Sequence, residues 1–268
     1  MTVASSNFVE SHVALLTKHG KQIILEPVFF EAFNTQIVHT DAFDTDKLGA
    51  FDGSVERVLS PENAALKKAY LACELTGCNQ GIGSEGSFVG HFGFGNINEE
   101  ILAFVDVSKK IEVIARYKQP TSLLPISAES ENELRAKLAD FEPKQKWNVN
   151  IGQQWLKGLH ADDVTSNVKK WPASIEPDFR AMHCPQRQQV IGITANSLVS
   201  RLQAICPKCD RVNFVPDHIE KGLPCELCMQ PTAQALYYLC DCKGCGYQLK
   251  VNEVSGTASA FYCQHCNP

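Results

Sequence analysis

The sequence predicts an α/β fold, with a layered mixed-sheet domain over residues 1–203 and a small metal-binding module over residues 204–268. Two observations carry this prediction. Segments with helical and strand periodicity alternate along the first two hundred residues, which is typical of helices packed on a sheet. Nine of the twelve cysteines lie after residue 205. A length of 268 residues suits one sizeable domain and one small one, because single domains usually run to roughly 100–200 residues.

The chain is expected to begin with a buried strand at residues 12–17, a polar turn at 18–21 and a helix that runs to about Phe33. We place Pro27 in the first turn of this helix, where the missing N–H costs little. Residues 35–40 alternate between apolar and polar side chains and predict a second strand.

The strongest helix signal begins at Ser60. This serine suits the N-cap, Pro61 suits the first helical position, and apolar residues recur at 65, 66, 69 and 73 before Gly77 ends the pattern. Residues 81–87 follow and contain three glycines, which predict a turn that bends sharply or lets the backbone approach a ligand.

The later elements are expected as a strand pair at 101–107 and 111–116, a helix at 127–138 and a final helix at about 186–203. The final helix carries apolar residues on one stripe, at positions 190, 191, 193, 198, 199 and 202. Residues 142–180 give no clear pattern. Helices that alternate with strands in this way indicate a layered α/β domain.

Four Cys-x-x-Cys pairs dominate the end of the chain. Two thiolates at this spacing can reach one metal ion from a tight turn, and four thiolates complete a tetrahedral zinc site. We therefore expect two structural zinc ions, because a closed four-thiolate site has no open position for water. The eight expected ligands are Cys206, Cys209, Cys225, Cys228, Cys242, Cys245, Cys263 and Cys266.

The sequence leaves the pairing of these four pairs open. The intervals of 15, 13 and 17 residues suit short hairpins, so we favour sequential sites in which the first pair joins the second and the third joins the fourth. The alternative is a nested arrangement, in which the central pairs share one ion and the outer pairs the other. Cys240 remains as a spare thiol or an alternative ligand, and His218 and His265 are not needed as ligands.

Charge limits the function classes. From Arg201 onward the sequence contains six basic and six acidic residues, and this balance of charge argues against strong nucleic-acid binding. No apolar run approaches the roughly 18–20 residues that span a bilayer, so no membrane partner is expected. The first twenty residues lack a basic region followed by a long apolar stretch, and we therefore expect a cytoplasmic protein.

Polar residues cluster at three expected element ends, at 18–21, 60–64 and 83–87. The order of Thr17, His19 and Lys21, then Glu-Asn-Ala at 62–64, Lys-Lys-Ala at 67–69, Thr-Gly at 76–77 and Gly-Ile-Gly-Ser-Glu-Gly at 81–86, resembles the inosine and xanthosine triphosphate pyrophosphatases. The resemblance covers roughly residues 12–118 and, weakly, 180–203. His19 stands where that family has asparagine.

The resemblance implies a magnesium-dependent hydrolase of nucleoside triphosphates or related phosphorylated small molecules. Its catalytic residues would be Lys21, which contacts phosphate, and Glu62 and Glu85, which would hold Mg²⁺. Asp44 and Asp46 are expected as loop carboxylates near the metal. The expected ligand-binding residues are Thr17, His19, Lys68, Ser84, Ser87, His91, Arg180 and His183.

Several of these residues also have a simpler explanation. Glu62 suits the helix dipole alone, Lys21 suits a solvated turn, and His91 and His183 suit structural roles. A second class of function therefore stays open, namely a non-catalytic adaptor that binds a nucleotide or nucleic acid and uses the zinc module to dock a partner.

Overall fold

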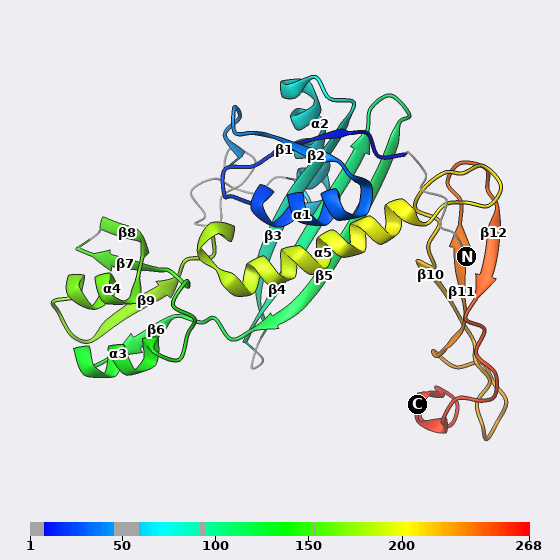
Figure 1. Cartoon of the computed structure of the whole chain (residues 1–268). Coiled ribbons are helices and arrows are strands. Elements are labelled where there is room, and N and C mark those ends of the chain that lie inside the picture. The colour runs from blue at the N-terminus through cyan, green and yellow to red at the C-terminus, as the bar shows by residue number, and fades with distance from the viewer. Residues whose placement is uncertain (1–7, 46–58, 92–94, 153) are drawn as a thin grey trace. The chain divides into compact units, whose positions relative to one another are not determined.

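The structure is a computed structural model that describes residues 8–45, 59–91, 95–152 and 154–268. Contacts between Cα atoms divide the chain into two compact units, Met1–Val199 and Ser200–Pro268. The first unit contains two sheets and the second contains one (Figure 1). The predicted loop carboxylate Asp46 lies outside the described residues.

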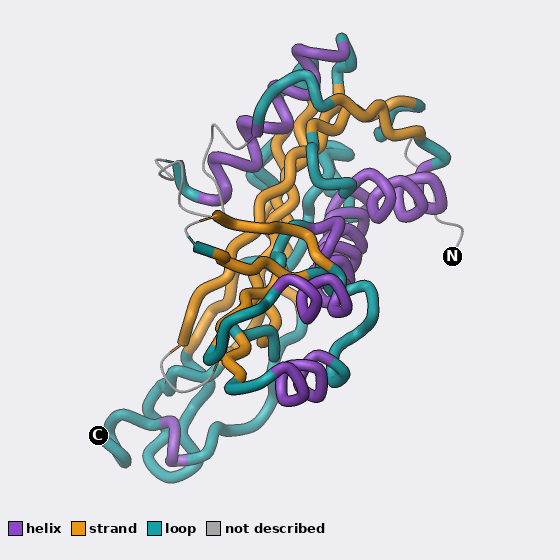
Figure 2. Tube along the Cα trace, turned by 90° about the vertical axis from the view of Figure 1, so that its left-hand side faces the viewer, coloured by secondary structure: helices purple, strands orange, loops and turns teal. Residues whose placement is uncertain are grey.

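The larger sheet of the first unit has five strands. Strand β1 (His12–Leu16) lies between β2 (Gln36–Thr40) and β3 (Gln80–His91) and is parallel to both. The order continues through β4 (Gly95–Asp106) and β5 (Ile111–Thr121), which are antiparallel to their neighbours. Figure 2 shows these long strands side by side. The sheet is therefore mixed, as the alternation of elements predicted.

Three helices pack on this sheet: α1 (Gln22–Phe33), α2 (Pro61–Thr76) and α5 (Pro185–Gln203). Successive strand residues point to opposite faces. Ser84 contacts Lys21 at the start of α1, whereas its neighbour Glu85 contacts Lys68 of α2. The helices α1 and α2 therefore cover opposite faces, and α5 lies on the face of α1, which Gly192 of α5 approaches at Ile24 (Figure 1).

The prediction for Pro27 was wrong by one helical turn. Helix α1 begins at Gln22, so Pro27 is its sixth residue and lies inside the helix. The missing N–H would have bonded to the carbonyl of Ile23, whose side chain is 74% exposed, and Pro27 is exposed as well. Water can therefore solvate the freed carbonyl on this side of the helix.

Helix α2 forms as predicted, with the Ser60 hydroxyl accepting from the backbone N–H of Asn63 and Gly77 ending the helix at φ +77°. The predicted glycine turn at 81–87 is wrong, because these residues form the middle of β3. A Cβ on Gly83 would lie 1.8 Å from the carbonyl oxygen of Ala65 in α2. Gly81 and Gly83 therefore let helix α2 approach the strand closely.

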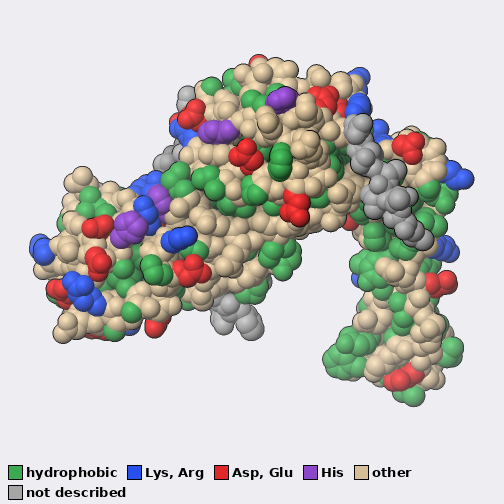
Figure 3. Space-filling view, viewed as in Figure 1, with side chains coloured by type: hydrophobic (Ala, Val, Ile, Leu, Met, Phe, Trp, Pro, Cys, Tyr) green, Lys and Arg blue, Asp and Glu red, His purple; other side chains and the backbone are tan. Residues whose placement is uncertain are grey.

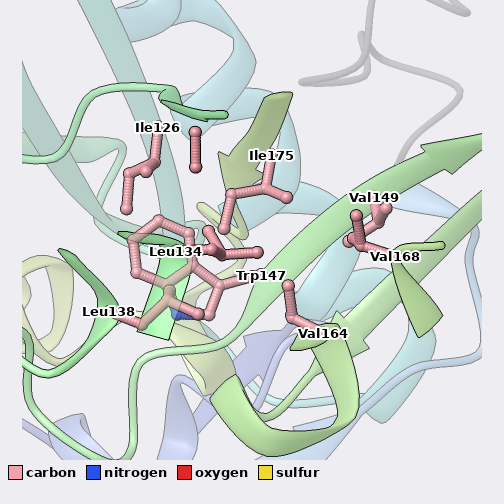
Figure 4. Packing of buried hydrophobic residues seen from close by; sticks show 9 residues of the cluster. Ile126, Leu134, Leu138, Trp147, Val149, Val164, Val168 and Ile175 are labelled. Carbon is pink, nitrogen blue, oxygen red and sulfur yellow. The ribbon is translucent and has the colours of Figure 1, made fainter. Parts of the chain in front are cut away.

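The smaller sheet of the first unit accounts for the segment that the sequence left unread. This sheet has four antiparallel strands, and its core contains Trp147, which is 1% exposed and packs against Ile126, Leu134 and Ile175 (Figure 4). In spatial order they are β6 (Ile126–Ala128), β9 (Ala173–Pro177), β7 (Trp147–Ile151) and β8 (Gln154–Leu159), with helices α3 (Glu131–Leu138) and α4 (Ala161–Asn167).

Two boundaries differ from the sequence prediction. The helix expected over 127–138 begins only at Glu131, because the residues before it extend as β6 and Ser130 caps the helix through the N–H of Glu133. In α5, Ile193 is 40% exposed, whereas Ala195 is fully buried. The apolar stripe of this helix therefore passes through Ala195 and not through Ile193.

The second unit is built on a three-stranded antiparallel sheet in the order β10 (His218–Lys221), β11 (Ala235–Asp241) and β12 (Gln248–Val251). A short 3-10 helix, η3 (Ala260–Tyr262), follows near the end of the chain. Across both units, none of the helices described has the length and apolar character that crossing a membrane requires.

Candidate functional site

The eight predicted cysteine ligands form two groups in the second unit. Cys206, Cys209, Cys242 and Cys245 make one group, and Cys225, Cys228, Cys263 and Cys266 make the other. Within the groups the Sγ···Sγ distances are 3.7 Å for Cys206–Cys245, 3.5 Å for Cys209–Cys242, 3.9 Å for Cys225–Cys266 and 3.6 Å for Cys228–Cys263. A zinc ion with Zn–S bonds of about 2.3 Å needs an edge of about 3.8 Å, so each group could hold one zinc ion.

Each Cys-x-x-Cys pair sits on the same kind of turn. The N–H four residues after the first cysteine bonds to that cysteine's carbonyl, as in Asp210 to Cys206 and Met229 to Cys225. A backbone N–H also points at the first sulfur, at 3.4 Å in Lys208, Leu227 and Gly244. These bonds stabilise thiolate charge, which is the form that binds metal.

The favoured sequential pairing was wrong, and so was the nested alternative. The first pair joins the third, and the second joins the fourth. The reason is that each interval holds one strand instead of a closed hairpin: β10, β11 and β12 in turn. Antiparallel strands carry successive pairs to opposite ends of the sheet, so alternate pairs meet at the same end.

Cys240 belongs to neither cysteine group. It lies in β11 opposite Leu249 and is 5% exposed, and burial raises the pKa of its thiol. His218 forms an ion pair with Glu220 at 3.5 Å when protonated. His265 lies outside both groups as well. The eight cysteines therefore suffice for both sites.

In the first unit, several of the predicted residues meet at the carboxyl end of β1. Lys21, at the start of α1, is 5% exposed and donates a 2.8 Å hydrogen bond from Nζ to the Oγ of Ser84. Thr17 is buried, its carbonyl bonds to His39 at 2.8 Å, and its hydroxyl accepts from the N–H of His19. The carboxyl ends of parallel strands are common ligand positions.

Two charged residues that the sequence analysis missed complete this cluster. Glu100 of β4 is fully buried and accepts from Arg187 at 2.5 Å, while its other oxygen lies 3.8 Å from Nζ of Lys21. Arg187 is 1% exposed and also donates to the carbonyl of Phe179 at 2.6 Å. A Cβ on Gly86 would clash with both side chains, so this glycine leaves room for the pair.

A second buried pair lies on the opposite face of β3. Lys68 of α2 donates to Glu85 at 2.5 Å, and the two side chains are 10% and 8% exposed. When Lys21 is protonated, Lys21, Lys68 and Arg187 carry three positive charges, against two negative charges on Glu85 and Glu100. We call these five residues the buried charge cluster.

The buried charge cluster perturbs Lys21 most clearly. Burial lowers its pKa from 10.5 to about 7, Arg187 and Lys68 lower it as well, and Glu100 and Glu85 act in the opposite direction. Removing an ammonium from water favours its neutral form. The Lys21 amine therefore changes charge near neutral pH, unlike an ordinary lysine.

Glu62 makes no ion pair with a residue of the buried charge cluster among the described residues. Its carboxylate pairs with Arg116 of β5, and the pKa of Glu62 is lowered by its own backbone N–H and by Arg116. Glu85 is already paired with Lys68. Mg²⁺ needs several free oxygen ligands, and among the described residues neither glutamate joins a group of three possible ligands. The magnesium role that the resemblance implies for Glu62 and Glu85 therefore stays a prediction.

The other residues predicted to bind a ligand are spread more widely. Ser87 faces the same side of β3 as Glu85 and pairs in register with Glu99. His91 is the last residue of β3 and pairs in register with Gly95. Asp44 forms an exposed ion pair with Lys18 at 2.7 Å.

Arg180 and His183 flank Gly158 of β8, at 3.2 Å and 3.3 Å from the position of an added Cβ. Arg180 binds both oxygens of Asp178. Burial lowers the pKa of His183, and its Nδ1 is buried without a hydrogen-bond partner among the described residues. Met182, between them, lies 3.6 Å from the position of an added Cβ on Gly20. The structure thus brings this segment beside the turn that carries Lys21.

A sequence signal for Arg187 existed. It precedes Val190 and Ile191 by three and four residues, so it falls on the apolar stripe of α5. A charge on such a stripe must find a buried partner. Glu100 gave a weaker signal, because it stands at the polar end of an apolar strand sequence.

The two four-cysteine groups could each hold a metal ion, and their ligand set is the one that structural zinc sites use. In comparisons with known proteins, residues 142–268 match the model of a family described as a domain of unknown function, DUF6671. The match begins before β7 and includes all eight cysteine ligands. No match was found among curated proteins or among solved structures.

Proposed function

We propose that the first unit binds the phosphate groups of a nucleotide beside Lys21 and hydrolyses a phosphoanhydride bond, while the second unit is a structural zinc module. The observation that carries the proposal is the buried charge cluster at the carboxyl end of β1, with three cations against two carboxylates. A buried excess of positive charge favours an anionic ligand.

The cluster offers groups for such a reaction. Lys21 and Arg187 supply N–H donors to phosphate oxygens, which carry the charge that develops as the leaving group departs. The family resemblance assigns Glu85 to the chemical step, in which a carboxylate can orient an attacking water molecule. Glu85 lies on the opposite face of β3 from Ser84 and pairs with Lys68. The magnesium requirement implied by the family resemblance stays a prediction, and no step here depends on it.

Titration calorimetry of the zinc-loaded chain with nucleoside mono-, di- and triphosphates, with and without magnesium, tests the binding step. Lys21→Met should weaken binding by at least about tenfold, because it removes one charged hydrogen bond. Lys18→Met is the matched control, since Lys18 lies in the same turn but is exposed and pairs with Asp44. Equal binding by both variants would contradict the proposal.

Pyrophosphate or phosphate release tests the chemical step. Glu85→Gln should abolish release without lowering nucleotide affinity by a similar factor, because the amide cannot serve as a base. A wild-type chain that binds nucleotides but releases neither product would favour a non-catalytic adaptor instead.

One observation favours the adaptor. Large apolar side chains are exposed around the second cysteine group, with exposed fractions of 74% for Leu227, 63% for Met229 and 71% for Phe261. Figure 3 shows hydrophobic side chains gathered at this end of the module. Exposed patches of this kind often mark protein interfaces. We call Leu227, Met229 and Phe261 the apolar tip.

Charge defines the partner that the apolar tip suits. The segments 222–234 and 252–268 contain Glu226 and Glu253 and no lysine or arginine, and four thiolates add further negative charge. The partner would be a protein with an apolar pocket and a basic rim, not a nucleic acid. Peptide display against the zinc-loaded chain should enrich apolar and basic peptides, and the double variant Leu227→Ser, Phe261→Ser should lose them. Enrichment that survives the double variant would exclude the apolar tip.

A further inference from the structure

The buried charge cluster carries one positive charge in excess when Lys21 is protonated. Arg187 contacts Glu100 at 2.5 Å. Lys68 contacts Glu85, also at 2.5 Å. The Nζ of Lys21 lies 3.8 Å from Glu100, which is beyond hydrogen-bond distance. Each of the two carboxylates therefore has a cation in direct contact, whereas among the described residues the ammonium of Lys21 contacts no carboxylate.

Lys21 is the member of the buried charge cluster that can give up this excess charge. An arginine side chain stays protonated in proteins. Loss of a proton from Lys68 would remove the charge that contacts Glu85. Lys21 is 5% exposed, and burial of an ammonium without a contacting carboxylate favours the neutral amine. Burial accordingly lowers the pKa of Lys21 to about 7.

The hydroxyl of Ser84 suits both forms of Lys21. A hydroxyl can accept a hydrogen bond from an ammonium, and it can donate one to a neutral amine. The 2.8 Å contact between Nζ and Oγ can therefore persist when the proton is lost. The site thus lets Lys21 lose and regain a proton without breaking this contact.

The charged groups that act on Lys21 come from four elements. They are Glu85 of β3, Glu100 of β4, Lys68 of α2 and Arg187 of α5. Two further titratable side chains lie close to the turn that carries Lys21. The N–H of His19 bonds to the hydroxyl of Thr17, and the ring of His39 in β2 bonds to the carbonyl of Thr17. Histidines can exchange protons near neutral pH, so the experiment must separate them from Lys21.

A third histidine lies on the segment beside this turn. His183 ends the short helix η2 (Ala181–His183), in which Met182 lies near Gly20. Burial lowers the pKa of His183 from 6.5. His183 is therefore largely neutral at pH 8, and a measurement at this pH reduces its contribution.

We propose that the buried charge cluster binds its anionic ligand together with one proton, which Lys21 takes up from the solvent. This inference rests on the proposed function, because it requires an anion beside Lys21. Without a ligand, the neutral amine leaves two cations against two carboxylates. A bound phosphate group adds negative charge, and the ammonium form of Lys21 then donates charge-assisted hydrogen bonds to its oxygens. The affinity for the anion should therefore fall as the pH rises above 7.

Titration calorimetry of the full zinc-loaded chain with adenosine triphosphate at pH 8 tests this inference. Phosphate groups have a second pKa of about 6, so the probe itself is almost fully ionised at this pH. Titrations in Tris and in HEPES, two buffers with different ionisation enthalpies, separate the heat of proton uptake from the heat of binding. About one proton should be taken up per bound nucleotide, and the affinity should fall by up to about tenfold between pH 8 and pH 9.

Lys21→Arg is the decisive variant, because arginine stays charged at both pH values. It should bind the nucleotide without proton uptake and with an affinity that no longer depends on pH. Lys18→Met, in the same turn, and the double variant His19→Gln, His39→Gln should take up the proton as the wild type does. If Lys21→Arg fails to fold, the pH dependence of the wild type and of these controls still decides.

Two kinds of failure can be told apart. Nucleotide binding without proton uptake, uptake that survives in Lys21→Arg, or uptake that is lost in either control would overturn this inference and leave the proposed function standing. No binding of the nucleotide at pH 7 or pH 8 would contradict the proposed function, and this inference with it.

Discussion

The ammonium nitrogen of Lys21 lies 2.8 Å from the hydroxyl oxygen of Ser84, although 63 residues separate them in sequence. This bond ties the turn after β1 to the middle of β3, and it holds Lys21 beside Glu100 and Arg187. Burial removes the hydration of the Lys21 ammonium, and its nearest carboxylate, Glu100, is shared with Arg187. Its electrostatics should therefore be measurable in the stability of the protein.

The free energy of unfolding should depend on pH through Lys21. Its pKa is about 7 in the folded chain and near 10.5 when unfolded, so the unfolded chain binds more protons between these values. Stability contributed by this group should rise with pH across that window, by at most about 1.4 kcal/mol per pH unit. Urea unfolding of wild type and Lys21→Met at pH 7, 8 and 9 measures the difference, with Lys18→Met as control.

Lys21→Met should thus be more stable than the wild type at pH 7, and the gap should narrow toward pH 9. A constant gap across this range would show that the Lys21 amine keeps an ordinary pKa.

The pair of Glu100 and Arg187 should show strong coupling. Arg187→Met alone leaves a buried carboxylate without its main partner, which costs about 3–5 kcal/mol. The double variant Arg187→Met, Glu100→Gln should lose less than the sum of the single losses, because neither Arg187 nor Glu100 is then left as a buried charge without the other. A double-mutant cycle from urea unfolding measures this coupling, and additive losses would refute it.

Gly83→Ala should destabilise the first unit by about 3 kcal/mol, because the new methyl group meets the backbone of α2 and forces an overpacked contact. Gly90→Ala in the same strand is the control, since the nearest described atom to its Cβ would be the side-chain oxygen of Asn96, at 3.5 Å. Thermal unfolding should separate the two variants clearly. Similar melting temperatures would mean that α2 does not pack on Gly83.

The interleaved zinc sites make a specific prediction about stoichiometry. Cys206→Ser with Cys242→Ser damages one group, so one zinc ion per chain should remain. Cys206→Ser with Cys225→Ser damages both groups, so neither should hold zinc tightly. Metal analysis after dialysis against a mild chelator distinguishes the outcomes. Sequential pairing would reverse the two results.

A good part of the structure could be predicted from local sequence. The helix from Ser60 to Gly77 was predicted because its cap, its proline and its terminal glycine lie within the helix itself. The eight cysteine ligands were predicted because each Cys-x-x-Cys pair lies within one short turn. Where the contacts that form an element lie within a few residues of one another, the spacing of residues in the sequence is enough to predict that element.

The sequence predictions were wrong where the structure depends on contacts between segments that are distant in the chain. Gly81 and Gly83 of β3 lie where α2 approaches the strand, and only the packed helix distinguishes this arrangement from a turn at a ligand. Which Cys-x-x-Cys pairs share a metal site depends on the antiparallel strands that reverse the chain direction between them. Glu100 and Arg187 are 87 residues apart and share no motif. They meet because α5 packs on the sheet face to which the Glu100 side chain of β4 points.

The sequence by itself thus determined that the chain has a mixed α/β part and eight thiolates spaced for two metal ions. Only the tertiary structure decided which thiolates share an ion and which charges are buried together with Lys21. The physical reason is that ligand spacing and helix caps are set over a few residues, whereas burial and charge pairing are set by segments that meet through packing.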